Sequence, residues 1–166
     1  MNLEVDLNSS FDANFDVLEE QFPSIKLISE ENSLKKIRTD ANDLLALLNE
    51  LKNDAMFDYD MLSTFIAIDL GENFELIYDL YSTETNKFMR VSVLIDRKFP
   101  KSPSVVDVFK SAHFDECEIF DMFGIEFSGN RKLKRLFMPK EWIGHPLRKD
   151  YVLEDKRLDW NLEEKS

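Results

Sequence analysis

The chain has few of the residues that build metal and redox centres. Its 166 residues include one cysteine, Cys117, and two histidines. A single cysteine excludes an internal disulfide and a self-contained iron–sulfur cluster, which takes about four cysteine ligands. A private zinc site is also disfavoured, because such sites use about four nitrogen or sulfur ligands. We therefore expect this chain to bind no metal ion and no redox cofactor by itself.

Glycine and long apolar segments are scarce as well. The four glycines are scattered, and they match neither the dinucleotide-binding fingerprint nor a phosphate-binding loop. No apolar run approaches the roughly 20 residues that span a bilayer. No basic start followed by an apolar core marks a secretory signal. We expect a soluble, cytoplasmic chain.

Positive charge is scarce overall and concentrated in one segment. The net charge is −12, which argues against nucleic-acid binding. Residues 131–150 nevertheless hold seven basic and two acidic residues, so this segment is +5 and the rest of the chain −17. The segment is either a solvated loop that balances its own acidic domain or a docking surface that steers a partner.

What the chain does have is enough apolar residues for a core. With 43% hydrophobic residues and 14 phenylalanines, it is a globular protein of one domain's length. The period of the apolar residues predicts helices near 11–22 and from an Asp40 cap to about Asn53. Runs at 25–28 and 34–38 are short strand candidates. Alternation predicts a three-stranded antiparallel meander from the runs 64–70, 74–81 and 88–95.

The second half of the chain predicts helices and then an irregular extension. A loop at 97–103 precedes a short helix capped by Ser104, and a second helix covers 112–123. Gly124 is placed to end that helix in the left-handed conformation. Residues 125–127 are extended and 128–130 turn the chain.

The fold class is therefore α+β, with an antiparallel or mixed β-sheet packed with helices. The chain divides into an α+β domain, 1–127, and an extended C-terminal partner-binding segment, 128–166. The extension has few apolar residues of its own, so we expect it to become ordered only on a partner.

The helix at 112–123 is rich in acids. Asp115, Glu116, Glu118 and Asp121 are interpreted as a solvated or partner-facing surface rather than as a carboxylate pair for acid–base catalysis. His113, Glu116 and Cys117 have metal-like spacing but lack further ligands. A nucleophilic Cys117 would need His145 as its base, and nothing in the sequence brings the two together.

The extension holds a turn-rich motif, Trp142 to Arg148. Gly144 permits a backbone angle closed to other residues, and Pro146 biases its predecessor away from helix. The resulting bend would present Trp142 and Leu147 on one side, with Arg148 beyond it. Tryptophan and arginine in a shaped loop are typical interface anchors. The alternative is a loop folded onto its own domain.

Three runs carry a resemblance to a known family: Glu116 to Ile125, Arg135 to Pro139, and Trp142 to Tyr151. Together they resemble the signature of the thirty-kilodalton subunit family of respiratory complex I, which in bacteria is the C subunit of NADH-quinone oxidoreductase. A weaker resemblance extends back through the 74–95 strands. Departures are Cys117 where the family usually has arginine, Phe114 where it usually has tryptophan, and Asn130-Arg131 where it usually has His-Pro. Cysteine cannot make arginine's bidentate pairing with a carboxylate.

The resemblance implies a cofactor-free subunit of the peripheral arm on the cytoplasmic side of the inner membrane, scaffolding the quinone-reducing module. Its implied partners are the forty-nine-kilodalton-type chain, which we call the D-like subunit, and the quinone-site iron–sulfur subunit. It touches the membrane only through the complex. NADH, FMN, quinone and the iron–sulfur clusters would belong to partner subunits. The implied partner-binding residues are Glu116, Glu118, Asp121, Gly124, Arg135, Met138, Pro139, Trp142, Gly144, His145, Pro146, Leu147, Arg148, Lys149, Asp150 and Tyr151.

Two alternatives stay open. Similar subunits occur in membrane-bound energy-converting hydrogenases and formate hydrogenlyases. An independent soluble adaptor protein is the other interpretation, and it predicts a stable monomer with an ordered tail.

Overall fold

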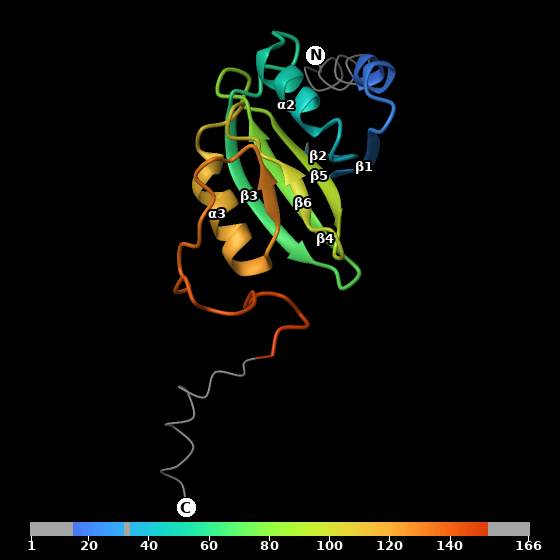
Figure 1. Ribbon diagram of the computed structural model, residues 1–166. Helices are drawn as coiled ribbons and strands as arrows, with labels where there is room; N and C mark the ends of the chain where they lie inside the picture. The colour runs from blue at the N-terminus through green and yellow to red at the C-terminus, as the bar shows by residue number, and fades with distance from the viewer. Residues whose placement is uncertain (1–14, 32–33, 153–166) are drawn as a thin grey trace, which may run out of the picture.

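A five-stranded mixed sheet forms the centre of the structure. The computed structural model describes residues 15–31 and 34–152. In space the strands follow the order β1 (Lys26–Glu31), β2 (Leu34–Thr39), β5 (Phe88–Asp96), β4 (Asn73–Tyr81) and β3 (Met61–Asp69). Strands β2 and β5 are parallel and the other neighbours are antiparallel. The predicted α+β class and the β3–β4–β5 meander are confirmed (Figure 1).

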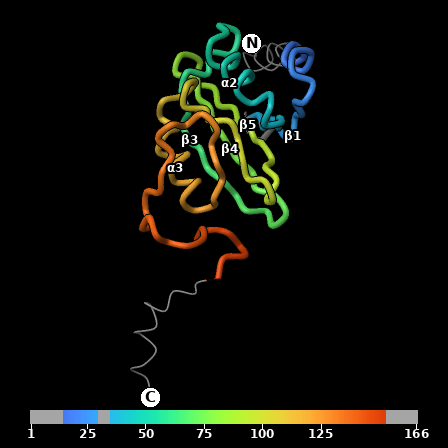
Figure 2. Tube along the Cα trace, in the orientation of Figure 1, coloured from blue at the N-terminus to red at the C-terminus, as the bar shows by residue number. Residues whose placement is uncertain are grey.

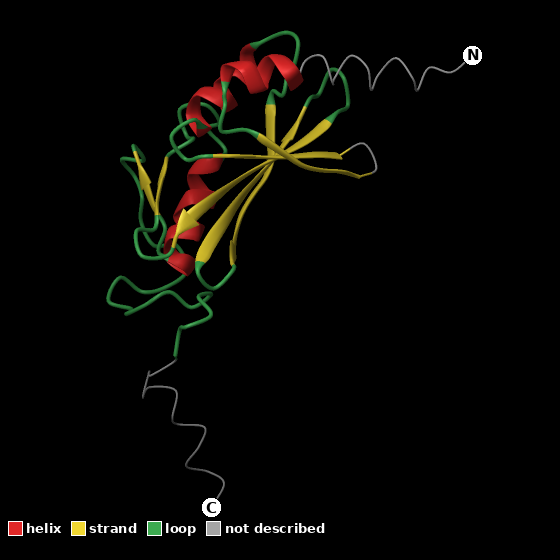
Figure 3. Cartoon of the chain, turned by 90° about the vertical axis from the view of Figure 1, so that its right-hand side faces the viewer, coloured by secondary structure: helices red, strands yellow, loops and turns green. Residues whose placement is uncertain are grey.

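The helices cover one face of this sheet. Helix α2 (Leu44–Asn53) buries four leucines, and α3 (Ala112–Phe123) packs beside β3. Strand β4 supplies the centre of the core: Phe74, Leu76, Tyr78 and Leu80 are fully buried. Figure 3 shows the helices on the same side of the sheet. The opposite face carries paired charges, with Arg90 on Asp79 and Arg38 on Glu75.

Two short strands flank α3 in the chain and pair with each other. Strand β6 (Lys101–Pro103) pairs in parallel with β7 (Glu126–Ser128), and a bond of 2.8 Å from the amide of Ser104 to the carbonyl of Ser128 extends the pairing. The loop predicted at 97–103 therefore contains a strand. Residue Gly124 has φ 71° and ends α3, as predicted.

Three predicted details of the helices are wrong or fall outside the described residues. Helix α2 begins at Leu44, because Asp40 instead accepts a turn bond from the amide of Asp43. Residues 105–109 form turns rather than a helix, since the carboxylate of Glu116 binds Ser104 and Val105 and holds them against α3. Residues 15–21 are helical, while 11–14 lie outside the described part of the chain.

After β7 the chain leaves the sheet and runs over the outside of α3 to the end of the molecule opposite α2 (Figure 2). No helix among the described residues has the length and apolar character that a membrane span requires. The extension predicted at 128–166 is described as far as Val152.

Candidate functional site

The C-terminal extension follows α3 residue by residue. Nδ2 of Asn130 lies 3.3 Å from Nδ1 of His113, and the carbonyl of Lys132 lies 3.8 Å from Sγ of Cys117. The amide of Leu136 donates to Asp121 further along the helix. Later residues of the extension thus meet later residues of α3. We call residues 129–152 the docked segment. The expectation that the extension becomes ordered only on a partner is wrong for these residues, because they bond to α3 of the same chain.

The carboxylate of Asp121 is the first anchor of the docked segment. Its side chain is fully buried, and its Oδ2 accepts three consecutive backbone amides, those of Leu136, Phe137 and Met138, at 3.0, 2.8 and 2.9 Å. Nη1 of Arg135 donates to Oδ1 at 2.7 Å. Burial alone would raise the pKa of Asp121, but these donors together lower it. The carboxylate is therefore ionised and its bonds are charge-assisted.

Arg135 ties the first part of the docked segment to its return loop. While Nη1 binds Asp121, Nη2 donates to the carbonyl of Gly144 at 3.1 Å. The amide of Leu147 then donates to the carbonyl of Met122 at 3.1 Å. One planar guanidinium thus joins helix, segment and loop, a geometry that lysine could not reproduce.

Gly124 gives the return loop a place to pack. A side-chain carbon at this glycine would lie 2.5 Å from Nη2 of Arg148 and from the ring of His145. Nε of Arg148 donates to the carbonyl of Phe123, and Nδ1 of His145 lies 3.0 Å from the carbonyl of Asp121. Burial lowers the pKa of His145, which favours the neutral ring with its Nδ1 hydrogen on that carbonyl.

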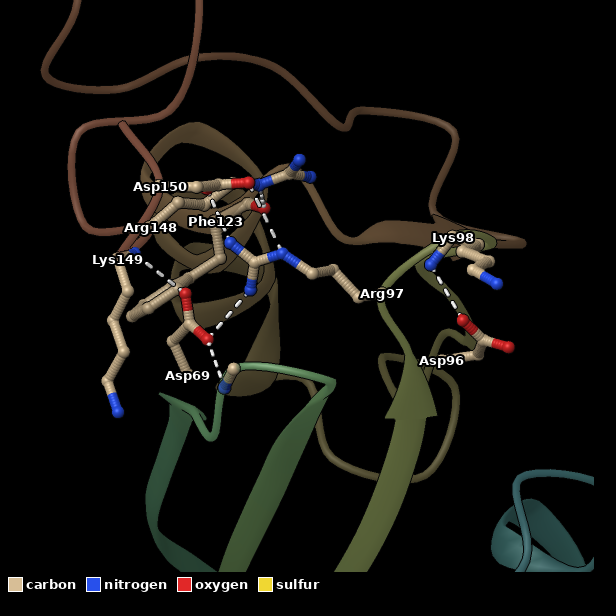
Figure 4. A network of polar contacts seen from close by, with 9 residues as sticks. Asp69, Asp96, Arg97, Lys98, Phe123, Arg148, Lys149 and Asp150 are labelled. Carbon is tan, nitrogen blue, oxygen red and sulfur yellow. Dashed lines mark hydrogen bonds and ion pairs between the residues drawn. The ribbon is translucent and has the colours of Figure 1, made fainter. Parts of the chain in front are cut away.

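Asp69, at the end of β3, is the second anchor (Figure 4). Its Oδ1 accepts the amide of Gly71 at 2.8 Å and Nη1 of Arg97 at 2.7 Å, and its Oδ2 accepts the amide of Lys149 at 2.8 Å. Arg97 also forms an ion pair with Asp150. Burial alone would raise the pKa of Asp69, but the donors lower it to about 2.

The ring of Phe74 lies under both arginines of this end. The guanidinium carbons of Arg97 and Arg148 are 5.0 and 5.4 Å from its centroid, and Phe123 meets it edge-on at 6.1 Å. Cations over an aromatic face are attracted by its quadrupole. The end of the docked segment is therefore held by ion pairs and by this ring.

Glu116 fixes the start of the docked segment. It is fully buried, and its oxygens accept the hydroxyl of Ser104, the amide of Val105 at 2.8 Å and Nδ2 of Asn130 at 2.8 Å. Burial raises the pKa of Glu116, against the effect of these donors. The prediction that the acids of α3 form an outer surface is wrong for Glu116 and Asp121, because both meet donors from the chain itself.

The other residues implied by the resemblance divide by exposure. Exposed members are Glu118, Pro139, Leu147, Lys149 and Asp150. Partly buried members are Arg135, Met138, Trp142, Gly144, His145, Pro146, Arg148 and Tyr151, and Gly124 is buried. The partly buried members shape the docked segment from within, and the exposed members are the ones accessible at its surface.

Sequence reasoning missed the second anchor. Asp69 and Lys149 are 80 positions apart, and only the turn signal of Gly71 marks the neighbourhood of Asp69. It also did not single out two apolar side chains inside the signature runs, Phe137 and Ile143, which are 65% and 90% exposed.

The chemical alternatives find no geometric support. Sγ of Cys117 lies against the carbonyl of Lys132, whereas His145 bonds to the carbonyl of Asp121. Within 15–31 and 34–152, no three histidine, cysteine or acidic side chains are grouped to hold a metal ion. The arrangement is one that fixes the conformation of an exposed segment.

Comparison with known proteins decides the family. A family model described as respiratory-chain NADH dehydrogenase, 30 Kd subunit, matches residues 37–157. The chain belongs to this family. The resemblance found from its three signature runs is thereby confirmed, and the protein is a subunit of the NADH-quinone oxidoreductase type.

Two relatives illustrate the family. The NADH-quinone oxidoreductase C subunit of Moorella thermoacetica is 35% identical over 139 residues, which cover 82% of this chain and 92% of the relative. The NADH-quinone oxidoreductase C/D subunit of Phocaeicola vulgatus is 40% identical over 94 residues, covering 55% of this chain and 18% of that much longer protein.

Two solved structures share the fold. A chain of the membrane-bound sulfane sulfur reductase, an archaeal respiratory membrane complex, aligns with a TM-score of 0.71 and 20% identity over 93% of this chain and 92% of its own. A trypsin-resistant fragment of Nqo5 aligns with a TM-score of 0.59 and 22% identity over 80% of this chain and all of its own. At these identities the likeness establishes the fold alone.

Replacing Asp121 by asparagine tests the first anchor. The amide group must place its NH₂ either toward three backbone amides or toward Arg135, so the D121N variant should lose about 3 kcal/mol of unfolding free energy. Urea denaturation measures this loss. The matched control is E118Q, since Glu118 is exposed on the same helix. Equal stabilities of D121N and E118Q would contradict the anchor.

Alanine at Gly124 tests the packing of the return loop. Gly71 and Gly124 both have positive φ, so alanine at either should cost about 1–2 kcal/mol of backbone strain. Only at Gly124 does the added carbon meet His145 and Arg148. The G124A variant should therefore be cut by trypsin at basic residues of the docked segment faster than G71A. Equal cleavage rates would show that the loop does not depend on this contact.

The stability of the docked segment should fall as the pH becomes acidic. Because the pKa of Asp69 lies at about 2 in the folded chain against an ordinary 3.8, its contribution is present above about pH 4 and is lost as pH falls toward about 2. Unfolding free energy measured between pH 6 and 2.5 should fall less steeply for D69N than for the wild type. D107N, at a fully exposed acid, should follow the wild type, and identical curves for all three would refute the assignment.

Proposed function

We propose that this chain is a non-redox subunit of the peripheral arm of a proton-translocating NADH:quinone oxidoreductase. In this role it scaffolds the quinone-reducing module by docking on the D-like (forty-nine-kilodalton-type) subunit and on the quinone-site iron–sulfur subunit. It binds no cofactor itself, and NADH, FMN, quinone and the clusters belong to its partners. It lies on the cytoplasmic side of the inner membrane and contacts the membrane only through the complex.

The observation that carries the proposal is the anchored, largely exposed docked segment in a member of this family. Buried carboxylates at Asp121 and Asp69 fix its backbone, while Phe137, Ile143 and Leu147 remain exposed. A loop fixed before binding loses little entropy when it meets a partner. Such a segment suits an interface better than it suits a reaction.

The relative that joins the C and D subunits in one chain supports the choice of partner. The Phocaeicola vulgatus protein is named as a C/D subunit and is far longer than its region of similarity to this chain. Fusion keeps two chains at a high effective concentration, which is useful when they associate directly. The D-like subunit is therefore the first partner to test.

A second candidate complex has its own support. The archaeal membrane-bound sulfane sulfur reductase contains a chain whose fold matches 93% of this one. The same scaffold role is thus compatible with a hydrogenase-type or other respiratory membrane complex. The two candidates share the docking role and differ in the electron donor and in the partner chains.

Native co-purification tests the proposal. The full chain carries an affinity tag and is recovered from detergent-solubilised membranes, and its partners are identified by mass spectrometry. We expect a D-like subunit, an iron–sulfur subunit and antiporter-like membrane chains. A nickel–iron large subunit would move the chain to the hydrogenase-type candidate. Recovery as a free monomer would contradict both and favour an independent soluble adaptor.

A further inference from the structure

Two exposed apolar residues of the docked segment, Phe137 and Ile143, have backbones that are tied to the same ion pair. The amide of Phe137 is bound by Asp121, and Asp121 is bound by Arg135. The same Arg135 holds the carbonyl of Gly144, the neighbour of Ile143. The backbones that carry Phe137 and Ile143 are therefore held by one buried ion pair, although the two side chains are 65% and 90% exposed.

The third apolar side chain of this region comes from the helix. Phe114 is 67% exposed and lies seven positions before Asp121, or about 10 Å along α3. The docked segment also carries three exposed lysines close in sequence to Phe137 and Ile143: Lys132, Lys134 and Lys140. We call these six residues the anchor face.

Isolated apolar residues on a surface need no explanation, but the anchor face differs in two respects. Its backbone is fixed by buried charge-assisted bonds, so the exposed side chains of Phe137 and Ile143 are carried by an ordered backbone. It also includes exposed lysines in a chain whose net charge is −12. Apolar anchors at the centre and charges at the rim are the usual composition of an interface.

The open face of the sheet is a weaker candidate. Ile66, Ile68 and Leu94 are exposed there by 43, 39 and 40%. Its charges already pair with one another, as Arg90 does with Asp79 and Arg38 with Glu75. The basic side chains of that face therefore already pair with acids, with Glu75 shared by Arg38 and Lys36, whereas the lysines of the anchor face are exposed.

We propose that Phe137 and Ile143, flanked by Phe114, insert into an apolar pocket of the D-like subunit whose rim is acidic and faces Lys132, Lys134 and Lys140. This assignment rests on the proposed function and adds to it which side chains make the contact. The buried members of the family signature, Glu116 and Asp121 among them, are then positioning residues that hold the anchor face in shape.

Affinity measurements on the full chain and the purified D-like subunit test the assignment. I143D should weaken binding at least about 30-fold, because a charge would enter an apolar pocket. The double variant K134E/K140E should also weaken it and should reverse the effect of salt. Wild-type binding should weaken as salt rises, since the rim charges attract the partner.

Matched controls lie at the other end of the molecule. Met56 is 50% exposed in the loop after α2, and Lys87 is exposed in the turn between β4 and β5. M56D and K87E should bind within about twofold of the wild type. All variants change exposed side chains, and thermal unfolding checks that each one is folded. A photo-crosslinker at position 143 should capture the D-like subunit, and one at position 56 should not.

The outcomes distinguish a failure of the proposed function from a failure of the anchor-face assignment. If the wild-type chain fails to bind the D-like subunit, the proposed function is wrong and the anchor face has no such partner. If the wild type binds and both I143D and K134E/K140E bind within about twofold of it, docking is real but uses another surface, and the present assignment is overturned.

Discussion

The conformation of the C-terminal segment depends on one buried carboxylate. Asp121 gathers three backbone amides and the Arg135 guanidinium, and in turn Arg135 reaches the carbonyl of Gly144. Extended chain without a core of its own needs such bonds, because little apolar burial offsets the entropy of ordering it. The protein replaces a second hydrophobic core with ionised groups whose donors come from the segment itself.

This arrangement explains how an interface can be prepared in advance without being buried in the free chain. The bonds that fix the segment are directed inward, at Asp121 and at Asp69, so they do not compete with a partner. Most side chains left outside are apolar or basic, and the acidic exceptions are Glu141 and Asp150. A second consequence is that substitutions at the buried acids should weaken docking by changing the conformation of the segment. Substitutions at Ile143 should weaken docking without changing that conformation.

The sequence predicted the sheet and the family more fully than it predicted the site. Apolar and polar residues alternate along β4 and β5, which indicates a sheet with its core on one face. This pattern can be seen in a short stretch of sequence. The roles of Glu116 and Asp121 are not local, because their partners lie 11–17 positions away and include backbone amides that have no sequence signature. From the sequence alone, four acids on a helix therefore indicate a solvated surface. Only the structure shows that other parts of the same chain cover two of them.

Asp69 illustrates the limit more sharply, since its bond to the amide of Lys149 spans 80 positions. What could have suggested it is charge: the basic segment is the part of an acidic chain best suited to meet acids of the same chain. The sequence allowed two interpretations, a loop folded on its own domain or a partner-binding surface, and treated them as rivals. The geometry makes them compatible, because Arg135, Arg148 and several backbone amides face inward while the lysines face solvent. One segment can thus balance its own domain and still carry positive charge toward a partner.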